Sequence, residues 1–313
     1  MVTAAIQVDQ LCHKYGPRTA LDDVSFAVQR GELFGLLGPN GGGKTTLFKI
    51  LSTLMRPSSG SASVFGDSIS DAPAAVRQHL GVVFQHPSLD GKLTVAENLA
   101  THGHLYGMRG AALRQRADAV LRRLGLADRA SDRVETLSGG LQRRTELGKA
   151  LLHQPPLLLL DEPSTGLDPG ARRDFIQYLG RLRDDEKVTV VFTTHYMDEA
   201  ERCDRVAILH QGRLVSVGPP EELKRRVGGD IVVIQAANPE ILRRKIQERF
   251  GCEPTLVDGT LRVERERGHE LVRDLVEAFP SEVTHVTFGR PTLEDVFIRL
   301  TGHRFWADGT GEE

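Results

Sequence analysis

Residues 38–46 of this 313-residue chain read Gly-Pro-Asn-Gly-Gly-Gly-Lys-Thr-Thr, and this stretch decides the fold. Gly38, Gly43, Lys44 and Thr45 match the pattern G-x-x-x-x-G-K-[ST], in which glycines let backbone N–H groups approach a phosphate closely. An apolar strand pattern precedes the stretch, and a helix pattern over residues 44–54 follows it. The helix would direct the positive end of its dipole at the loop. This context predicts a phosphate-binding loop rather than a flexible glycine-rich turn.

The loop predicts ATP and Mg²⁺ as ligands. Lys44 would reach the β- and γ-phosphates, and Thr45 would hold Mg²⁺. The residues of this loop that we expect to bind the nucleotide are Gly38, Pro39, Asn40, Gly41, Gly42, Gly43, Lys44, Thr45 and Thr46.

Two carboxylates follow a second apolar run further along the chain. Four leucines, residues 157–160, end in Asp161 and Glu162, which is the pattern of a buried strand that delivers acidic side chains to its carboxyl end. Asp161 would orient Mg²⁺, and Glu162 would take a proton from an attacking water or hold that water in line. Alone, such a pair is more often a solvated strand end, but about 120 residues after a phosphate-binding loop it is strong evidence.

Composition and charge exclude several classes. The net charge of −2 provides no global field to attract nucleic acid or acidic lipid. Three scattered cysteines, Cys12, Cys203 and Cys252, predict no disulfide framework and fit a reducing, cytoplasmic location. No apolar run approaches the roughly 20 residues that span a bilayer. A role at a membrane would therefore require another chain to provide the spanning part.

The first 225 residues or so alternate between strand and helix patterns, which predicts an α/β fold with a largely parallel sheet covered on both faces. Strands are expected at residues 24–28, 32–37, 81–85, 157–161 and 188–193. Residues 86–136 read instead as a helical insert, with Thr94 and Glu97 as a capping box. Its second helix has one apolar face, made by Leu113, Ala117, Val120, Leu121 and Leu124.

The pattern restarts after residue 227 in the order β-α-β-β-α-β, which resembles a small ferredoxin-like unit. Asp258 and Gly259 form a hairpin signal between two short strands. Thr292 and Asp295 are spaced to cap a last helix. We therefore predict a nucleotide-binding domain over residues 1–227, an α+β accessory domain over 228–302 and a disordered tail over 303–313.

Between the loop and the carboxylates lies Leu137-Ser138-Gly139-Gly140, which resembles the signature of the ATP-binding cassette (ABC) family. P-loop proteins generally lack this sequence. The resemblance implies that two chains pack head to tail, and that Ser138, Gly139 and Gly140 contact the γ-phosphate held by the second subunit. By itself, a Ser-Gly-Gly turn before a helix is an anion site or simply a helix cap.

Four more features resemble parts of the ABC cassette. Gln85 resembles the Q-loop glutamine, which senses Mg²⁺ and the attacking water, and residues 164–168, ending at Asp168, resemble the D-loop at the dimer interface. His195 resembles the switch histidine at the γ-phosphate, and Tyr15 the aromatic residue that stacks on adenine. Without the resemblance these would be a surface glutamine, a structural histidine and a core aromatic. The resemblance implies Glu162, His195 and Gln85 as catalytic residues and Thr45, Gln85 and Asp161 as metal ligands.

Two positions depart from the family pattern. Leu141 stands where a glutamine usually follows the signature, which removes one side-chain amide near the composite site. Gly42 replaces the commoner alanine of the loop, which is a mild change. Every residue that handles Mg²⁺, water and the γ-phosphate is present, so we expect an active ATPase site.

Details narrow the resemblance to the ATPase subunits of ABC-2-type exporters, including daunorubicin-resistance-like ATPases. These details are residues 194–201, residues 203–206 and the ending Pro-Thr-Leu-Glu-Asp-Val-Phe at 291–297. The resemblance covers residues 1–302. It implies a homodimer at the cytoplasmic face of the membrane that powers a separate integral membrane ABC-2-type permease and binds no nucleic acid. Members of the group export drugs, lipids, polysaccharides or ions.

Two rival functions stay open at this point. Importers of sugars often add a C-terminal β-barrel, whereas the α+β unit expected here is shorter. ABC ATPases that act on DNA insert long coiled coils, but only 91 residues separate Gly43 from Val134. ABC ATPases of translation usually carry two cassettes in one chain. The accessory domain either braces the dimer, which we favour, or forms a regulatory module.

Overall fold

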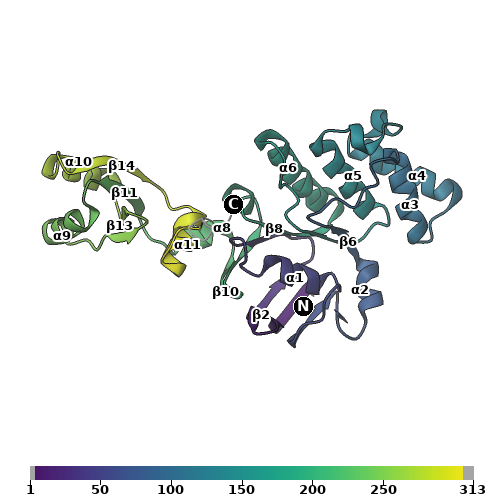
Figure 1. The fold of residues 1–313 in the computed structure, drawn as a ribbon, viewed down its shortest axis with the longest axis horizontal. Helices are drawn as coiled ribbons and strands as arrows, with labels where there is room; N and C mark the ends of the chain where they lie inside the picture. The colour runs from purple at the N-terminus through teal and green to yellow at the C-terminus, as the bar shows by residue number, and fades with distance from the viewer. Residues whose placement is uncertain (1–3, 306–313) are drawn as a thin grey trace. The chain divides into compact units, whose positions relative to one another are not determined.

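The computed structural model describes residues 4–305, and the chain forms two compact units that divide between Leu214 and Val215 (Figure 1). The sequence pattern placed the boundary after residue 227. The difference has a physical reason in helix α8 (Pro220–Arg225), which packs against the last helix of the second unit. Among the described residues, no helix is both long and apolar enough to cross a bilayer.

The first unit is built on a six-stranded sheet in the order β10-β9-β3-β8-β7-β6. Pairing is parallel from β9 through to β6. The strands are β3 (Leu33–Leu37), β6 (Leu80–Val83), β7 (Leu157–Leu160), β8 (Thr189–Thr194), β9 (Arg205–His210) and β10 (Arg213–Gly218). Every residue of β3, β7 and β8 is buried, as expected for strands of a parallel sheet covered on both sides.

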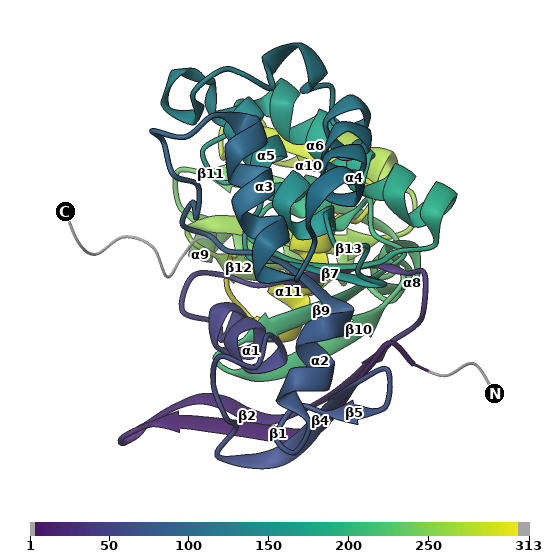
Figure 2. The same ribbon diagram turned by 90° about the vertical axis from the view of Figure 1, so that its right-hand side faces the viewer.

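Helices cover both faces of this sheet (Figure 2). Helix α1 (Lys44–Leu51) lies on one face, and α5 (Gly139–Leu151) and α6 (Pro169–Glu186) lie on the other. The short helix α7 (Met197–Ala200) follows β8. The predicted α/β architecture is confirmed.

A second, antiparallel sheet in the order β2-β1-β4-β5 was largely missed by the sequence analysis. It comprises β1 (Ile6–Tyr15), β2 (Arg18–Val28), β4 (Ser59–Val64) and β5 (Asp67–Ser68), and α2 (Pro73–His79) follows it. Only the end of β2 was expected. The register of β1 against β2 shifts between Val8 and Leu11, and Gln10 has φ 47°, so the regular alternation of a strand is interrupted.

The helical insert has the expected form. It contains α3 (Val95–Leu105), α4 (Gly110–Arg123) and the 3₁₀ turns η1 (Ala127–Arg129) and η2 (Val134–Thr136). The capping box is formed, because the Glu97 N–H donates to Thr94 Oγ1 at 3.2 Å and the Thr94 N–H donates to Glu97 Oε2 at 2.8 Å. The predicted apolar face of α4 is buried.

The second unit has the predicted β-α-β-β-α-β order and a ferredoxin-like antiparallel sheet, β12-β13-β11-β14. Its strands are β11 (Asp230–Ala236), β12 (Thr255–Val257), β13 (Thr260–Arg265) and β14 (Val283–Gly289). Its helices beyond α8 are α9 (Pro239–Phe250), α10 (Gly268–Ala278) and α11 (Leu293–Thr301). Asp258 and Gly259 both have positive φ, 46° and 74°, as a two-residue hairpin turn requires.

The end of the second unit is fixed by a cap and a buried ring. Thr292 and Asp295 form the expected capping box at the start of α11. Phe305 is buried and packs edge-to-face on Phe297, with ring centroids 4.9 Å apart. The part of the predicted disordered tail from residue 303 to 305 is therefore ordered here, and residues 306–313 lie outside the described residues.

Candidate functional site

The topology brings four loops to one edge of the main sheet. Because β6, β7, β8 and β3 run parallel, their carboxyl ends share that edge, and their register sets Leu37 opposite Thr194 and Leu160 opposite both Phe192 and Val83. The loop after each strand carries one set of predicted site residues. Ligands of open α/β sheets bind at this edge.

The glycine-rich loop after β3 is held by its own lysine. Lys44 is buried, and its Nζ donates to the carbonyls of Gly38 at 2.8 Å and Pro39 at 3.0 Å. Gly43 has φ 102°, and a Cβ there would lie 2.8 Å from the carbonyl oxygen of Ala20. The loop therefore needs glycine at this position for both its conformation and its packing. No side chain caps the start of α1, so its first N–H groups are left for an anion.

Glu162 is the centre of the charged part of the site. Its Oε1 lies 3.4 Å from Lys44 Nζ and its Oε2 lies 3.2 Å from His195 Nδ1. Burial raises the pKa of Glu162, but the hydrogen bond from His195 and the charge of Lys44 outweigh it and bring the pKa to about 2. Glu162 also has φ 43°, a conformation that residues other than glycine adopt rarely and that costs backbone strain.

A threonine of the neighbouring strand β8 holds Asp161, the residue before Glu162. Thr193 Oγ1 donates to Asp161 Oδ1 at 2.6 Å and accepts from the Glu162 N–H at 2.8 Å. Burial raises the pKa of Asp161, and the Thr193 hydrogen bond opposes this. Burial also lowers the pKa of Lys44, which the neighbouring Glu162 opposes. The threonine thus fixes both carboxyl-bearing residues at once.

A cavity of about 450 Å³ joins most of the predicted site. Beyond the loop it is lined by Gln85 after β6, Glu162 after β7 and His195 after β8. Tyr15 lines it as well and is 44% exposed, which leaves its ring available for stacking. The predicted residues that line this cavity are Tyr15, Asn40, Gly41, Gly42, Gly43, Lys44, Thr45, Thr46, Gln85, Glu162 and His195.

The signature residues do not line this cavity. Ser138 and Gly140 border a separate pocket of about 340 Å³, and Gly139 borders another of about 180 Å³. Ser138 takes the N-cap position of α5, yet its side chain makes no capping hydrogen bond and it is exposed. The alternative reading of Ser138 as a plain helix cap is therefore not favoured.

The D-loop residue Asp168 has a structural partner within the chain. Its Oδ1 caps α6 by accepting from the N–H groups of Gly170 at 3.0 Å and Ala171 at 2.9 Å. Its expected place at a dimer interface stays a prediction.

Sequence reasoning missed three residues of the site, and it named a fourth, Thr165, only as part of the D-loop. Arg18 and Thr165 also line the nucleotide cavity, Thr193 holds the carboxylates, and Arg143 binds the loop behind them. Signals existed for two of them: a basic residue just after Tyr15, and a hydroxyl two residues before His195. Backbone carbonyls are the partners of Arg143, and these leave no trace in a sequence.

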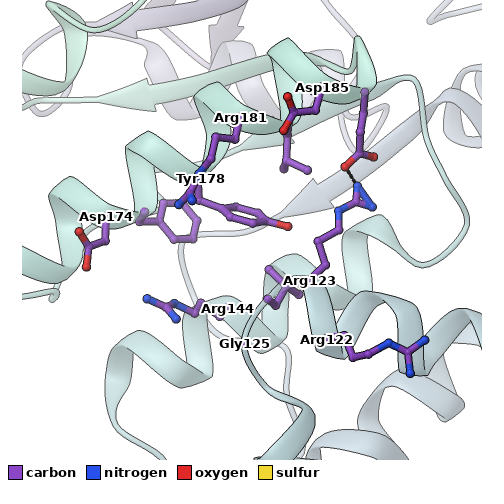
Figure 3. Close-up of a pocket in the computed structure, with 12 residues that line it drawn as sticks. Arg122, Arg123, Gly125, Arg144, Asp174, Tyr178, Arg181 and Asp185 are labelled. Atoms are coloured by element: carbon purple, nitrogen blue, oxygen red, sulfur yellow. Dashed lines mark ion pairs between the residues drawn. The ribbon is translucent and has the colours of Figure 1, made fainter.

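A further pocket of about 570 Å³ lies between the end of α4, the start of α5 and α6 (Figure 3). It is lined by four arginines and three acidic residues, and Arg123 pairs with Glu186 inside it. Tyr178 lies in the middle with its hydroxyl directed toward Arg123 (Figure 3). The pocket has no glycine-rich loop among its lining residues, and its mixed charge does not favour a phosphate.

Comparison with known proteins agrees with this geometry. Residues 21–165 match the family model described as ABC transporter, and residues 218–301 match the model described as ATP-binding protein DrrA1-3-like, C-terminal domain. A shorter match, residues 136–197, is to a model described as AAA domain, putative AbiEii toxin, Type IV TA system. The chain is 35% identical over 308 residues to the linearmycin resistance ATP-binding protein LnrL of Bacillus subtilis, covering 95% of this chain and 98% of that one. The chain belongs to the ABC transporter ATP-binding family.

Other relatives of this ABC protein match over nearly the whole length. The daunorubicin resistance ATP-binding protein DrrA3 of Streptomyces coeruleorubidus is 37% identical, covering 96% of this chain and 97% of that one. The Nod factor export ATP-binding protein I of Neorhizobium galegae is 38% identical, covering 96% and 86%. The predicted resemblance to this group, and the prediction of an ATP-binding ATPase, are confirmed.

Solved structures support the fold of the cassette. The structure of cbiO1 from Clostridium perfringens, described as part of the ABC transporter complex cbiONQ, matches with a TM-score of 0.67 and 26% identity, covering 80% of this chain and 96% of that one. The dimeric bacterial ABC transporter cassette MJ0796 matches with a TM-score of 0.62 and 28% identity, covering 68% and 98%.

Proposed function

We propose that this ABC ATPase subunit forms a head-to-tail homodimer that powers a membrane exporter. The observation that carries the proposal is the division of the site. One cavity gathers the phosphate loop, Glu162, His195 and Gln85, whereas the signature turn at Ser138 faces elsewhere and is exposed. In this proposal each chain contributes its nucleotide cavity to one ATP site and its signature turn to the other.

The charges of the cavity suggest how hydrolysis is controlled. Glu162 is ionised, and it is held by Lys44 and His195, the two side chains that we expect at the phosphates. Phosphate oxygens that draw these two groups away would release Glu162 to orient a water molecule. Losing the two partners would also raise the pKa of Glu162 toward that of a useful base. Nucleotide binding itself would thus prepare the catalytic glutamate.

The residues present fit Mg²⁺ as a partner of the nucleotide. Among the described residues, no cluster of three or more His, Cys, Asp or Glu can hold a metal ion. Mg²⁺ does not need such a cluster, because it is usually bound through one or two carboxylates together with substrate phosphates. Asp161, Thr45 and Gln85 are the proposed protein ligands, and the ion would neutralise charge on the phosphates.

The second subunit would be another copy of this chain. The match to a cassette described as dimeric supports this, as does the uncapped, exposed Ser138 at the start of α5. The N-terminus of that helix would place free N–H groups on the γ-phosphate bound to the partner. In this proposal the D-loop with Asp168 crosses the interface.

The transport role is proposed from the relatives. Those that match along the whole chain are described as resistance or export ATP-binding proteins, and none of the three named above is described as acting on nucleic acid. We propose an integral membrane permease of the ABC-2 type as partner, with this chain at the cytoplasmic face of the membrane. Importer and nucleic-acid roles are the competing outcomes of the test below.

The catalytic part is tested by ATP turnover. Lys44→Ala and Glu162→Gln should each lower turnover on the order of 100-fold or more. Glu221→Gln, which changes an exposed glutamate that pairs with Lys224, is the matched control and should turn over ATP like the wild type. Turnover near wild type in both site variants would overturn the site assignment.

The transport part is tested by copurification. The Glu162→Gln protein should stay closed on MgATP, so it is tagged and purified from native membranes in mild detergent. A stoichiometric polytopic membrane protein that is absent from the Lys44→Ala sample or reduced in it supports the exporter role. Recovery only with ribosomes or DNA would overturn that role and leave the ATPase assignment intact.

A further inference from the structure

One buried arginine joins the signature helix to the catalytic loop. Arg143 lies in the second turn of α5 and is 8% exposed. Its Nε donates to the carbonyl of Pro163 at 2.6 Å, and its Nη1 donates to the carbonyl of Phe84 at 2.8 Å. Its Nη2 donates to the carbonyls of Asp161 at 3.2 Å and Glu162 at 3.3 Å. Four backbone carbonyls therefore converge on one guanidinium.

These carbonyls belong to the two segments that carry the reacting side chains. Residues 161–163 form the turn that holds Glu162 in its positive-φ conformation. Such a conformation persists only when surrounding contacts over-determine it. The carbonyl of Phe84 shares a rigid peptide plane with the N–H of Gln85, so fixing one orients the other. Arg143 is thus bonded to the backbone on which both Glu162 and Gln85 depend.

Arg143 is also rigidly connected to the signature turn. The helix begins at Gly139, directly after Ser138, and at 1.5 Å per residue Arg143 lies about 7 Å along the axis from Ser138. The cavity of about 180 Å³ above it is lined by Gly139, Gln85 and the D-loop residue Gly166, as well as by Arg143 itself. The signature turn, the Q-loop and the D-loop therefore meet around this one side chain.

The next turns of α5 hold the same Q-loop segment. Glu146 accepts hydrogen bonds from the N–H of Ser88 at 2.5 Å and from its hydroxyl at 2.9 Å. Lys149 Nζ donates to the carbonyl of Ser88 at 2.7 Å. Helix α5 is therefore bonded to the Q-loop segment at Phe84 and at Ser88, and a displacement of the helix would move both residues.

We propose that Arg143 is a positioning residue through which the signature helix of a subunit sets the catalytic glutamate and the Q-loop of that same subunit. This inference rests on the proposed head-to-tail dimer. ATP on the partner's loop engages Ser138 and moves α5. Arg143 passes this movement to Glu162, which acts on the subunit's own ATP. The two nucleotide sites of the dimer are thereby coupled.

The chemistry of the contact requires arginine. A guanidinium offers five N–H donors in a fixed fork, which suits several carbonyls at once, whereas an ammonium is a compact point charge with three donors. The carbonyls also compensate for burying the charge. Arg143→Lys keeps the charge and loses the fork, and Arg143→Gln loses both.

A second arginine, which bonds the other end of α5, provides a matched control. Arg116 of α4 donates to the carbonyls of Leu151 at 2.7 Å and Leu152 at 2.9 Å, at the far end of α5. Replacing Arg116 also removes hydrogen bonds between an arginine and carbonyls of α5, but at the end of the helix away from the nucleotide loops. Arg116→Lys and Arg116→Gln therefore report what loss of such a contact does to folding alone.

The experiment compares the four full-length variants and the wild type by ATP turnover, the Hill coefficient for ATP, binding of a fluorescent ATP analogue and melting temperature. Both Arg143 variants should turn over ATP about 2- to 30-fold more slowly than wild type, the range expected for residues that carry coupling between sites. Their Hill coefficient should fall toward 1, with affinity for the analogue unchanged within about 2-fold. The Arg116 variants should keep the wild-type Hill coefficient, whatever their melting temperature.

Several results would overturn the inference. Arg143 variants with wild-type turnover and cooperativity would do so, and so would a wild-type enzyme that hydrolyses ATP with a Hill coefficient of 1. Should Arg143→Gln not fold, Arg143→Lys carries the same expectation. Failure of the proposed dimer looks different, because the Glu162→Gln protein would then stay a monomer in size-exclusion chromatography with MgATP.

Discussion

The hydroxyl of Thr193 offers a sharp test of how the site is held together. Thr193 is fully buried on β8, and its single hydroxyl donates to the Asp161 carboxylate and accepts from the Glu162 N–H. Thr193→Val replaces that hydroxyl with a methyl group of nearly the same size. Thr193→Ser keeps the hydroxyl and removes only the methyl group. The pair therefore separates hydrogen bonding from packing at one position.

The expected magnitudes follow from the two hydrogen bonds. A hydrogen bond to a charged group contributes about 1.5–3 kcal/mol, and a buried N–H left without a partner costs about 1–3 kcal/mol. The extra buried methyl group of valine returns about 0.8 kcal/mol. Thr193→Val should therefore destabilise the first unit by about 2–5 kcal/mol, and Thr193→Ser by about 1 kcal/mol.

The assay is differential scanning calorimetry of the full chain, with ATP turnover measured on the same samples. For a unit of this size, 1 kcal/mol shifts the melting temperature by about 2–4 °C, so Thr193→Val should lower it by between about 4 and 20 °C. Turnover should fall more for valine than for serine, because Glu162 loses an anchor for its positive-φ backbone. If serine destabilises the protein as much as valine, packing rather than hydrogen bonding holds the site and the reasoning fails.

Three further predictions concern pH and the loop. The pKa of Glu162 is lowered to about 2 in the folded state, so its contribution to stability is present above its unfolded value of 4.5 and is lost as pH falls toward 2. Urea titrations from pH 5 to 2 should thus show a shallower loss of stability for Glu162→Gln than for wild type, and equal slopes would contradict this. Burial lowers the pKa of His102 to about 4 in the folded state, whereas the unfolded value is 6.5. Between these values the unfolded chain binds a proton that the folded chain does not, so stability falls as pH falls from 6.5 to 4. In His102→Asn the urea midpoint should change less with pH between 6.5 and 4 than in the wild type. An equal change in both proteins would contradict this. Gly43→Ala forces a Cβ to 2.8 Å from the carbonyl of Ala20 at φ 102°, and it should reduce binding of a fluorescent ATP analogue at least 10-fold, more than an exposed-site change costs. Affinity within about 2-fold of wild type would show that the loop adapts.

The parts of the fold that were predicted carry strong local signals. Residues 157–160 are four leucines in a row, which is the pattern of a strand buried on both faces, and the structure has β7 there. The cap at Thr292 was predicted from a side chain that satisfies nearby backbone groups, and the Asp258 and Gly259 turn from residues that tolerate positive φ. Prediction from sequence works where a residue type directly suits the local backbone conformation or its local hydrogen bonds.

The parts that were missed depend on interactions without a local signature. The alternation of β1 is broken at Gln10, so its strand signal is lost although the strand forms against two neighbours. Arg143 bonds backbone carbonyls that lie 18 to 59 residues away in the chain, and Thr193 bonds the Glu162 N–H 31 residues away. Any residue can supply a carbonyl or an N–H, so such partners are visible only once the fold has brought them together.

The proposed dimer accounts for a difference in burial between the nucleotide cavity and the signature turn. The groups that act on a subunit's own nucleotide are largely enclosed, with Lys44, Asp161 and Glu162 all buried. Ser138 and Gly139 are exposed and leave the start of α5 without a side-chain cap. An uncapped helix start costs stability in an isolated chain, and its exposed N–H groups are left to water until an anion or another molecule covers them. If the signature turn served this chain alone, adding a capping interaction would be harmless. In the proposed dimer the turn receives a phosphate from a second subunit and has to stay open, so the second subunit would be part of the site rather than an addition to it.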